Sequence, residues 1–245
     1  MYKYEMHMHT SEGSACGKST GAEMVEYYRS RGYAGAVVTD HFYHGNTEPS
    51  RSLGWREYVS HFSEGYYHAK EAADRLDFDL FFGVEERLID YSEYLVLGLA
   101  PEWYAAHPEL RDMFGVEFLD TVRSAGAFVI QAHPFRERPY MTSGEIHLTP
   151  HHVDALEIRN CGNPPEIDRR AYEYAKRLGK PMTGGSDNHI ASGEDKPLSG
   201  IELPFRCKTI EQLIAAIRDG KHTVIDAETA ANAPLSEPQY SVTVH

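Results

Sequence analysis

Polar side chains that can bind a metal ion follow one short apolar run after another along this chain. The runs include GAVVTDH (35–41), FDLFFGVEE (78–86) and AFVIQAH (127–133), which have the length and composition of buried strands. Helix-like stretches separate most of them. In parallel α/β folds the carboxyl ends of the strands meet at one face, where active sites form. The pattern therefore predicts a sheet whose strand ends share one polar mouth.

The order of these elements predicts a single α/β domain. We expect about eight strands, the first at 2–9 and the last at 222–228, with a helix at about 165–178 among those that connect them. Near-continuous apolar strands alternating with helices favour a parallel sheet that is covered on both faces or closed into a barrel. The domain is expected to span residues 1–228. Residues 229–245 lose periodicity and are expected to form an irregular tail.

Charge and composition narrow the class of protein. The 245 residues are 41% hydrophobic, which is enough for one sizeable core. A net charge of −13 attracts nucleic-acid backbones poorly, so long nucleic acid is an unexpected partner. The start has no apolar segment typical of a secretory signal, and no run is long enough to cross a membrane. The 3 cysteines are an odd number and widely spaced, so they are not expected to form a disulfide framework, which fits a reducing cytoplasm.

The candidate metal ligands are imidazoles and carboxylates at five strand ends. They are His7, His9, His41, Glu85, His133, Asp187 and His189. His7 and His9 are two apart on a strand, so both leave the same face. Glu85 has two oxygens and could bridge two ions, whereas Glu86 should point the other way, into solvent. Each residue alone could be structural, as a cap or a satisfied core histidine; their shared position favours ligands. Imidazole with carboxylate suits Zn, Mn or Fe better than Mg or Ca.

Two arginines and one loop are the candidate substrate contacts. Arg136, in HPFR, is the candidate phosphate clamp because guanidinium matches phosphate oxygens bidentately, although it could be a surface arginine in a charged loop. Arg159, which ends DALEIRN, is a second candidate. The segment 42–56 is expected to line the mouth and help to choose the leaving group, chiefly through Tyr43 and His44. The alternative for this segment is an ordinary surface loop.

The motif order HMHT, TDH, GVE, QAHP and GSDNH resembles the PHP superfamily (polymerase and histidinol phosphatase domains) from residue 1 to about 228. The resemblance implies a distorted (β/α)7-type barrel that holds two or three divalent metal ions (Zn, Mn or Fe). It also implies a distribution of ligands. The first ion would be held by His7, His9, Glu85 and Asp187, the second by Glu85 and His133, and the third by His41 and His189.

The chain departs from the family pattern at two positions. Relatives often have a His or Asp shortly after the HxH motif, where the nearest match here is Cys16. They also often have a His in the strand after the GVE-like motif, where this chain has SEYLVLG. Glu93, Tyr94 or a water could replace that His. Whether Cys16 and Glu93 are ligands, and whether the third site is filled, stays open.

Together these features predict a metal-dependent phosphoesterase that acts on a small phosphorylated metabolite. A metal-bound hydroxide would attack phosphorus in a monoester. The general acid stays open among His189, His41, Asp187 and a second water. One alternative is a phosphodiesterase or nuclease-like PHP hydrolase. Another is a degenerate metal-binding regulatory scaffold. The sequence does not choose the natural substrate, the metal or the oligomeric state.

Overall fold

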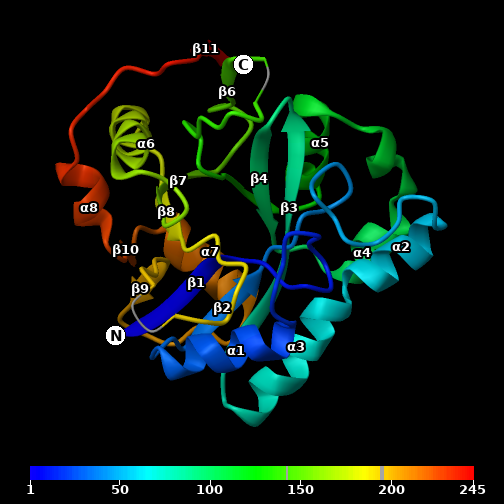
Figure 1. The fold of residues 1–245 in the computed structure, drawn as a ribbon. Coiled ribbons are helices and arrows are strands. Elements are labelled where there is room, and N and C mark those ends of the chain that lie inside the picture. Colours follow the sequence, from blue (N-terminus) through cyan, green and yellow to red (C-terminus); the bar gives the residue numbers. More distant parts are fainter. Residues whose placement is uncertain (142, 194–195) are drawn as a thin grey trace.

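A nine-stranded sheet organises the chain (Figure 1). The structure is a computed structural model and describes residues 1–141, 143–193 and 196–245. The strand order is β10-β9-β1-β2-β3-β4-β5-β7-β8. The strands are β1 (Tyr2–Met8), β2 (Gly35–Val38), β3 (Asp79–Ile89), β4 (Ser92–Leu97), β5 (Phe128–Gln131), β7 (Ala155–Asn160), β8 (Met182–Gly185), β9 (Ile201–Leu203) and β10 (Thr223–Val224).

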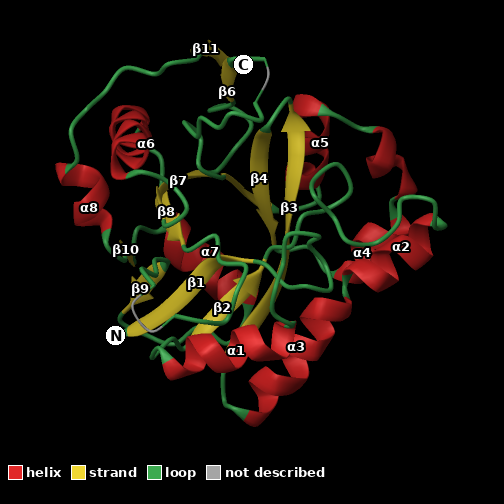
Figure 2. Ribbon diagram, in the orientation of Figure 1, coloured by secondary structure: helices red, strands yellow, loops and turns green. Residues whose placement is uncertain are grey.

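The sheet curls until its far end approaches β1. Residues just past β8 pair with the end of β1, because the His9 amide donates to the Asn188 carbonyl at 2.9 Å and Met8 forms a bridge with Asn188. Strands β1, β2, β3, β4, β5, β7 and β8 therefore follow one another around a nearly closed barrel, from which β9 and β10 extend beside β1 (Figure 2). The predicted distorted α/β barrel is confirmed.

The sheet is mixed, so the expected parallel arrangement is wrong for part of it. Strand β4 is antiparallel to both β3 and β5, and β9 is antiparallel to β1. Only Asp90 and Tyr91 separate β3 from β4. A link of two residues can join only an antiparallel hairpin, since a parallel pair needs a crossover of a dozen or more residues. The reversal places the start of β4, including Glu93, beside the end of β3.

Helices pack around the barrel. They are α1 (Gly21–Ser30), α2 (Trp55–Phe62), α3 (Glu64–Arg75), α4 (Pro101–Ala106), α5 (Gly115–Ser124), α6 (Pro165–Leu178), α7 (Ile210–Arg218) and α8 (Ala227–Asn232). Thr20 caps α1 in a reciprocal box with Glu23. Leu213 and Ile217 of α7 are fully buried in a cluster with apolar residues of β1, β3, β4 and β5. Within the described ranges, no helix has the length and apolar character needed to cross a membrane.

The C-terminal segment is more ordered than expected. The expected strand at 222–228 is reduced to β10, and α8 follows it directly. Strand β11 (Ser241–Val244) then pairs in parallel with β6 (Glu145–Leu148). The irregular tail predicted at 229–245 is therefore wrong in its secondary structure. All four residues of β11 are exposed, so the strand has no burial pattern that a sequence could reveal.

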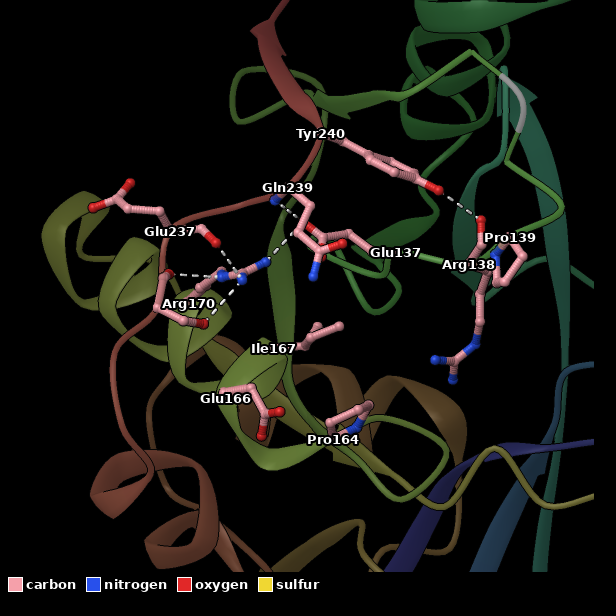
Figure 3. A pocket seen from close by; sticks show the side chains of 11 residues that line it. Glu137, Arg138, Pro139, Pro164, Glu166, Ile167, Arg170, Glu237, Gln239 and Tyr240 are labelled. Atoms are coloured by element: carbon pink, nitrogen blue, oxygen red, sulfur yellow. Dashed lines mark hydrogen bonds and ion pairs between the residues drawn. The ribbon is translucent and has the colours of Figure 1, made fainter.

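Arg170 of α6 holds the segment between α8 and β11 in place (Figure 3). Its guanidinium is buried and donates to the Ser236 carbonyl at 2.8 Å and to the Glu237 carbonyl at 2.6 Å. Oε1 of Glu137 accepts hydrogen bonds from both Arg170 and the Gln239 amide. These bonds attach the C-terminal segment to the loop that follows β5, beside a hollow of about 440 Å³.

Candidate metal centre

The predicted ligands meet at one place, although they are far apart in the sequence. They form overlapping groups whose nitrogen and oxygen atoms lie within 4.8 Å of one another. The groups are His7–His9–Glu85, His41–Glu85–Glu93, His7–His133–Glu157 and His9–His41–His189. Asp187 lies beside them, with Oδ1 3.3 Å from Nε2 of His9. The structure thus brings all seven predicted side chains together.

Glu85 lies at the centre of this cluster. Its Oε1 is 3.1 Å from Nε2 of His7 and 3.2 Å from Nε2 of His133. Its Oε2 is 2.8 Å from Nδ1 of His41 and 3.5 Å from Nε2 of His9. One buried carboxylate therefore faces four imidazoles, each oxygen between two of them. This is the arrangement that a bridging ligand requires.

Glu86, the next residue on β3, faces the other side of the strand, as alternation requires. The expectation that it is solvated is wrong, because it is fully buried. Its Oε1 accepts hydrogen bonds from the amides of His44 at 2.8 Å and Arg87 at 3.0 Å. Burial raises the pKa of the Glu86 carboxyl to about 8. The segment after β2 covers this face, which the local pattern does not show.

Four buried atoms of the cluster have no hydrogen-bond partner among the residues that the structure describes. They are Nε2 of His7, Nε2 of His9, Nδ1 of His41 and Oε2 of Glu85. Some of these atoms are close to one another, but their directions do not form hydrogen bonds. An unsatisfied buried polar atom costs about 1–3 kcal/mol, so four in one place need a common explanation. Divalent cations fit, because lone pairs of imidazole and carboxylate are their donors.

Glu157 orients His7 and was not predicted. Its Oε1 lies 3.0 Å from Nδ1 of His7, and its Oε2 accepts the His133 amide at 2.9 Å. A carboxylate at Nδ1 keeps the proton there, so Nε2 presents its lone pair to the cluster. The signal in the sequence was a carboxylate inside the apolar run ALEI, which strand alternation turns toward the barrel interior.

Ser14 and Asp40 orient His9 in the same way. The Ser14 hydroxyl donates to Oδ1 of Asp40 at 2.7 Å, and Nδ1 of His9 lies 3.1 Å from the same hydroxyl oxygen. Because the hydroxyl proton is committed to Asp40, the oxygen accepts the proton of Nδ1. The lone pair of His9 is therefore also at Nε2. Asp40 therefore orients His9 indirectly, through the hydroxyl of Ser14.

Two of the predicted ligands have unusual backbone conformations. His133 has φ +29° and Asp187 has φ +50°, in the left-handed region that costs energy for residues other than glycine. Strain of this kind persists where surrounding structure holds a functional side chain in place. Just before Asp187, a Cβ on Gly185 would lie 2.3 Å from Cβ of His7. The glycine therefore lets β8 approach the HxH strand.

The charges in the cluster depend strongly on one another. Burial opposes the charged form of His7, but the carboxylates of Glu85 and Asp187 outweigh it and raise the pKa of His7 well above its usual value. Burial also opposes ionisation of Glu85, yet His7 and His41 bring its pKa well below the usual value. Burial lowers the pKa of His9, and His189 and His41 lower it further. The site thus favours ionised carboxylates, which attract cations.

A cleft of about 490 Å³ opens beside the cluster. Three predicted ligands, His41, Asp187 and His189, reach it. Arg136 lines it as well, with Nη2 2.6 Å from Oδ2 of Asp187 and Nε donating to the Asn163 side chain at 2.9 Å. The other lining residues are Cys16, Gly45, Asn46, Arg87, Tyr91, Glu93 and Tyr140.

Arg159 does not reach the cleft. Its Nη1 lies 2.9 Å from Asp168 and its Nε lies 2.9 Å from Asp226, so the guanidinium is committed to carboxylates on α6 and before α8. The register between β7 and β8 shifts between Glu157 and Arg159. Spacing by two would otherwise place both side chains on one face of the strand. The expectation that Arg159 binds substrate is not supported.

Tyr43 and His44 also lie away from the cleft. Tyr43 packs edge-on against Trp55 and Tyr58 at centroid distances of 5.4 and 5.1 Å. The ring of His44 lies 4.3 Å from that of Phe114. The segment 42–56 does border the cleft, but through the next two residues, Gly45 and Asn46.

Cys16 and Glu93, the two departures from the family pattern, are both at the site. Burial raises the pKa of Cys16, but hydrogen bonds with His189 and His41 outweigh it and lower the pKa to about 6. Glu93 has Oε2 3.5 Å from Nε2 of His133 and Oε1 3.8 Å from Nδ1 of His41. Both side chains therefore lie close enough to the candidate ligands to bind a metal ion together with them.

Comparison with known proteins finds one matching family model and several solved structures with the same fold. Residues 167–193 match the family described as PHP-associated. The comparison with curated proteins found no match. The chain has the fold of a two-domain protein from Bacteroides vulgatus containing a predicted PHP-like metal-dependent phosphoesterase, with 16% identity and a TM-score of 0.68. The match covers 91% of this chain and 64% of that one, so this chain spans less than two thirds of that protein.

Two further structures share the fold. PsfC from Pseudomonas syringae is 16% identical, with a TM-score of 0.58 and coverage of 94% of both chains. The lesion-specific endonuclease PfuEndoQ from Pyrococcus furiosus is 12% identical, with a TM-score of 0.55 and coverage of 91% of this chain and 57% of that one. At these identities the likeness concerns the fold, which is PHP-like.

Proposed function

We propose that this PHP-like chain hydrolyses a small phosphate monoester with the help of divalent metal ions. The proposal rests chiefly on the four unpartnered atoms of His7, His9, His41 and Glu85, which are buried together beside an open cleft. The donor atoms of the cluster fall into groups within 4.8 Å of one another, which is close enough for a cation to bind several of them at once.

The resemblance to the PHP superfamily implies how the ions would be distributed among these residues. His7, His9, Glu85 and Asp187 would hold the first ion. Glu85 and His133 would hold the second, together with Glu93. His41 and His189 would hold the third, together with Cys16. The mixture of imidazole and carboxylate favours Zn, Mn or Fe.

When bound, such ions supply a strong nucleophile from water at neutral pH and stabilise negative charge on phosphoryl oxygens. The protein supplies position and charge. Arg136 faces the cleft beside Asp187 and would bind a phosphate oxygen. Glu157 and Ser14 fix the orientation of His7 and His9, so the site is preorganised before substrate arrives.

The proposed partner is a small phosphorylated metabolite. The cleft volume of about 490 Å³ is within the range of small-molecule sites. The formal charge of −13 does not favour long nucleic acid. The fold shared with PfuEndoQ keeps a phosphodiester substrate as the alternative to test, and a regulatory scaffold without turnover is the other.

Hydrolysis of two model esters tests the proposal. The protein is loaded with Mn or Zn and given p-nitrophenyl phosphate or bis-p-nitrophenyl phosphate. Turnover of the monoester alone supports the proposal, and turnover of the diester supports the phosphodiesterase alternative. If neither ester is turned over with Zn, Mn or Fe, the result supports the alternative of a metal-binding regulatory scaffold without turnover. Elemental analysis of the purified protein identifies the metal independently.

A further inference from the structure

Two tyrosines form an aromatic wall in the cleft. The rings of Tyr91 and Tyr140 have centroids 5.6 Å apart, with planes inclined at 55°. Both line the cleft beside the candidate metal centre. Tyr91 lies in the tight turn between β3 and β4, and Tyr140 lies in the loop after β5. Two segments that are distant in the sequence thus contribute one ring each to the same wall.

The wall is open to a ligand. The chain buries most of its large aromatic side chains, and Tyr58, Tyr94 and Tyr104 are fully buried. Tyr140 is instead 51% exposed, and Tyr91 is partly exposed. Aromatic side chains present a large apolar face at little entropic cost and pair well with another ring. An aromatic pair left open in a cleft is therefore suited to bind a ring of the ligand.

Arg87 connects this wall to the candidate metal centre. Its guanidinium carbon lies 5.5 Å from the centroid of Tyr91, within the range of cation–π contact. Its Nη2 lies 3.0 Å from Oε1 of Glu93. Because Glu93 also lies near His133 and His41, the aromatic wall has a fixed position relative to the cluster.

The lining of the cleft therefore combines two chemistries. Arg136, Asp187 and His189 are polar, and a phosphate would lie beside them if the proposed function holds. Tyr91 and Tyr140 are aromatic. A substrate that contacts both sets of residues has a phosphate and, attached to it, a flat apolar group.

From this arrangement we infer that the preferred substrates are phosphate monoesters whose leaving group carries a planar ring, with Tyr91 and Tyr140 as specificity-determining residues. The inference rests on the proposed function for the place of the phosphate. The ring could belong to an aryl alcohol or to the base of a nucleotide. Both present the same flat face to the wall.

Matched pairs of esters test the inference. The first pair is 2-phenylethyl phosphate and 2-cyclohexylethyl phosphate, which have leaving groups of similar basicity and size but differ in planarity. The second is 5′-AMP and ribose 5-phosphate, which differ in the base. For each pair, kcat/KM is measured with the Mn-loaded protein, and binding is measured by calorimetry under the same conditions. We expect a preference of about fivefold to tenfold for the ring-bearing ester in at least one pair.

Substitutions assign that preference to the wall. Tyr91→Leu and Tyr140→Leu should remove most of it, mainly through KM, whereas Tyr140→Phe should retain it. Tyr67→Leu is the control, since Tyr67 is similarly exposed but lies on α3, outside the cleft. All variants should hydrolyse the ring-free esters at similar rates, which shows that the catalytic centre is intact.

The outcomes separate the inference from the proposed function. If only 2-phenylethyl phosphate is preferred over its partner, the wall binds an aryl group. If 5′-AMP is also preferred over ribose 5-phosphate, the wall binds a nucleotide base as well. Equal kcat/KM and equal binding within both pairs overturn the inference, even if every ester is hydrolysed. A preference that the leucine variants keep overturns it as well. If no ester is hydrolysed, the proposed function fails, and the calorimetric binding ratios still decide on the aromatic wall.

Discussion

Nδ1 of His7 lies 3.0 Å from Oε1 of Glu157, while Nε2 of the same ring lies 3.1 Å from Oε1 of Glu85. The imidazole is therefore held between two buried carboxylates with different tasks. Glu157 fixes the orientation of the ring, and Glu85 shares the space where a cation would bind. Glu157 also accepts the amide of His133, so a single carboxylate positions two candidate ligands.

Replacing Glu157 should weaken metal binding without removing a ligand. Glu157→Gln keeps the size of the side chain but removes the charge that favours the proton on Nδ1 of His7. Losing such a partner typically lowers metal affinity by about 10–100-fold. Calorimetric titration with Mn measures the change. Glu211→Gln, at an exposed position of α7, is the control. Equal affinities in the two variants would show that Glu157 does not orient His7.

Removing a central ligand should abolish both turnover and metal retention. His9 and Asp187 face each other across 3.3 Å. His9→Ala and Asp187→Ala each take one donor from the proposed first site. Elemental analysis after dialysis should find at least one ion fewer per chain than in the unaltered protein. A variant that keeps full activity and full metal content would overturn the ligand assignment.

Arg136→Ala should weaken substrate capture more than it slows the chemical step. A lost charge-assisted hydrogen bond to phosphate is worth about 1.5–3 kcal/mol, so KM should rise by about tenfold or more. Steady-state kinetics on p-nitrophenyl phosphate measures the split between KM and kcat. Arg138→Ala, in the same loop but outside the cleft lining, is the control, and identical kinetics in both variants would make Arg136 a structural residue.

Metal removal should lower the melting temperature. Cations would bind the folded cluster of His7, His9, His41 and Glu85, whose donor atoms are distant in the sequence and come together only in the fold. A ligand at a thousand times its Kd stabilises the folded state by about 4 kcal/mol. Thermal unfolding is compared after treatment with EDTA and after reloading with Mn or Zn. A melting temperature that responds to neither treatment would argue against cation binding at the cluster.

Metal affinity should decrease as the pH falls. Without metal, the pKa values of His7 and His41 are raised well above the usual value, because nearby carboxylates, Glu85 above all, outweigh burial. At pH values below the raised pKa each imidazole carries a proton that a metal ion must displace. Affinity should therefore drop by about tenfold per pH unit for each displaced proton. Calorimetry in buffers of different ionisation enthalpy measures the number of protons released when the metal binds. If no proton is released, His7 and His41 are not protonated in the metal-free protein.

The sequence by itself determined the α/β class, the place of several elements and the identity of the seven candidate ligands. These are local properties. A short β-branched or aromatic run forms a strand, and a ligand-type residue at its end is visible without knowing its neighbours. Helix α6 begins and ends where its pattern predicts, at Pro165 and Leu178. The convergence of strand ends in one mouth followed from the geometry of α/β folds.

The tertiary structure alone decided what depends on partners distant in the sequence. The reversal of β4 brought Glu93 to the cluster, and a register shift in β7 committed Arg159 to Asp168 and Asp226. Pairing with β6 ordered the tail. Glu157 became an orienting residue only because the fold places it beside Nδ1 of His7. Periodicity shows which residues are buried, but strand direction, register and the contacts of a buried charge are set by packing between segments.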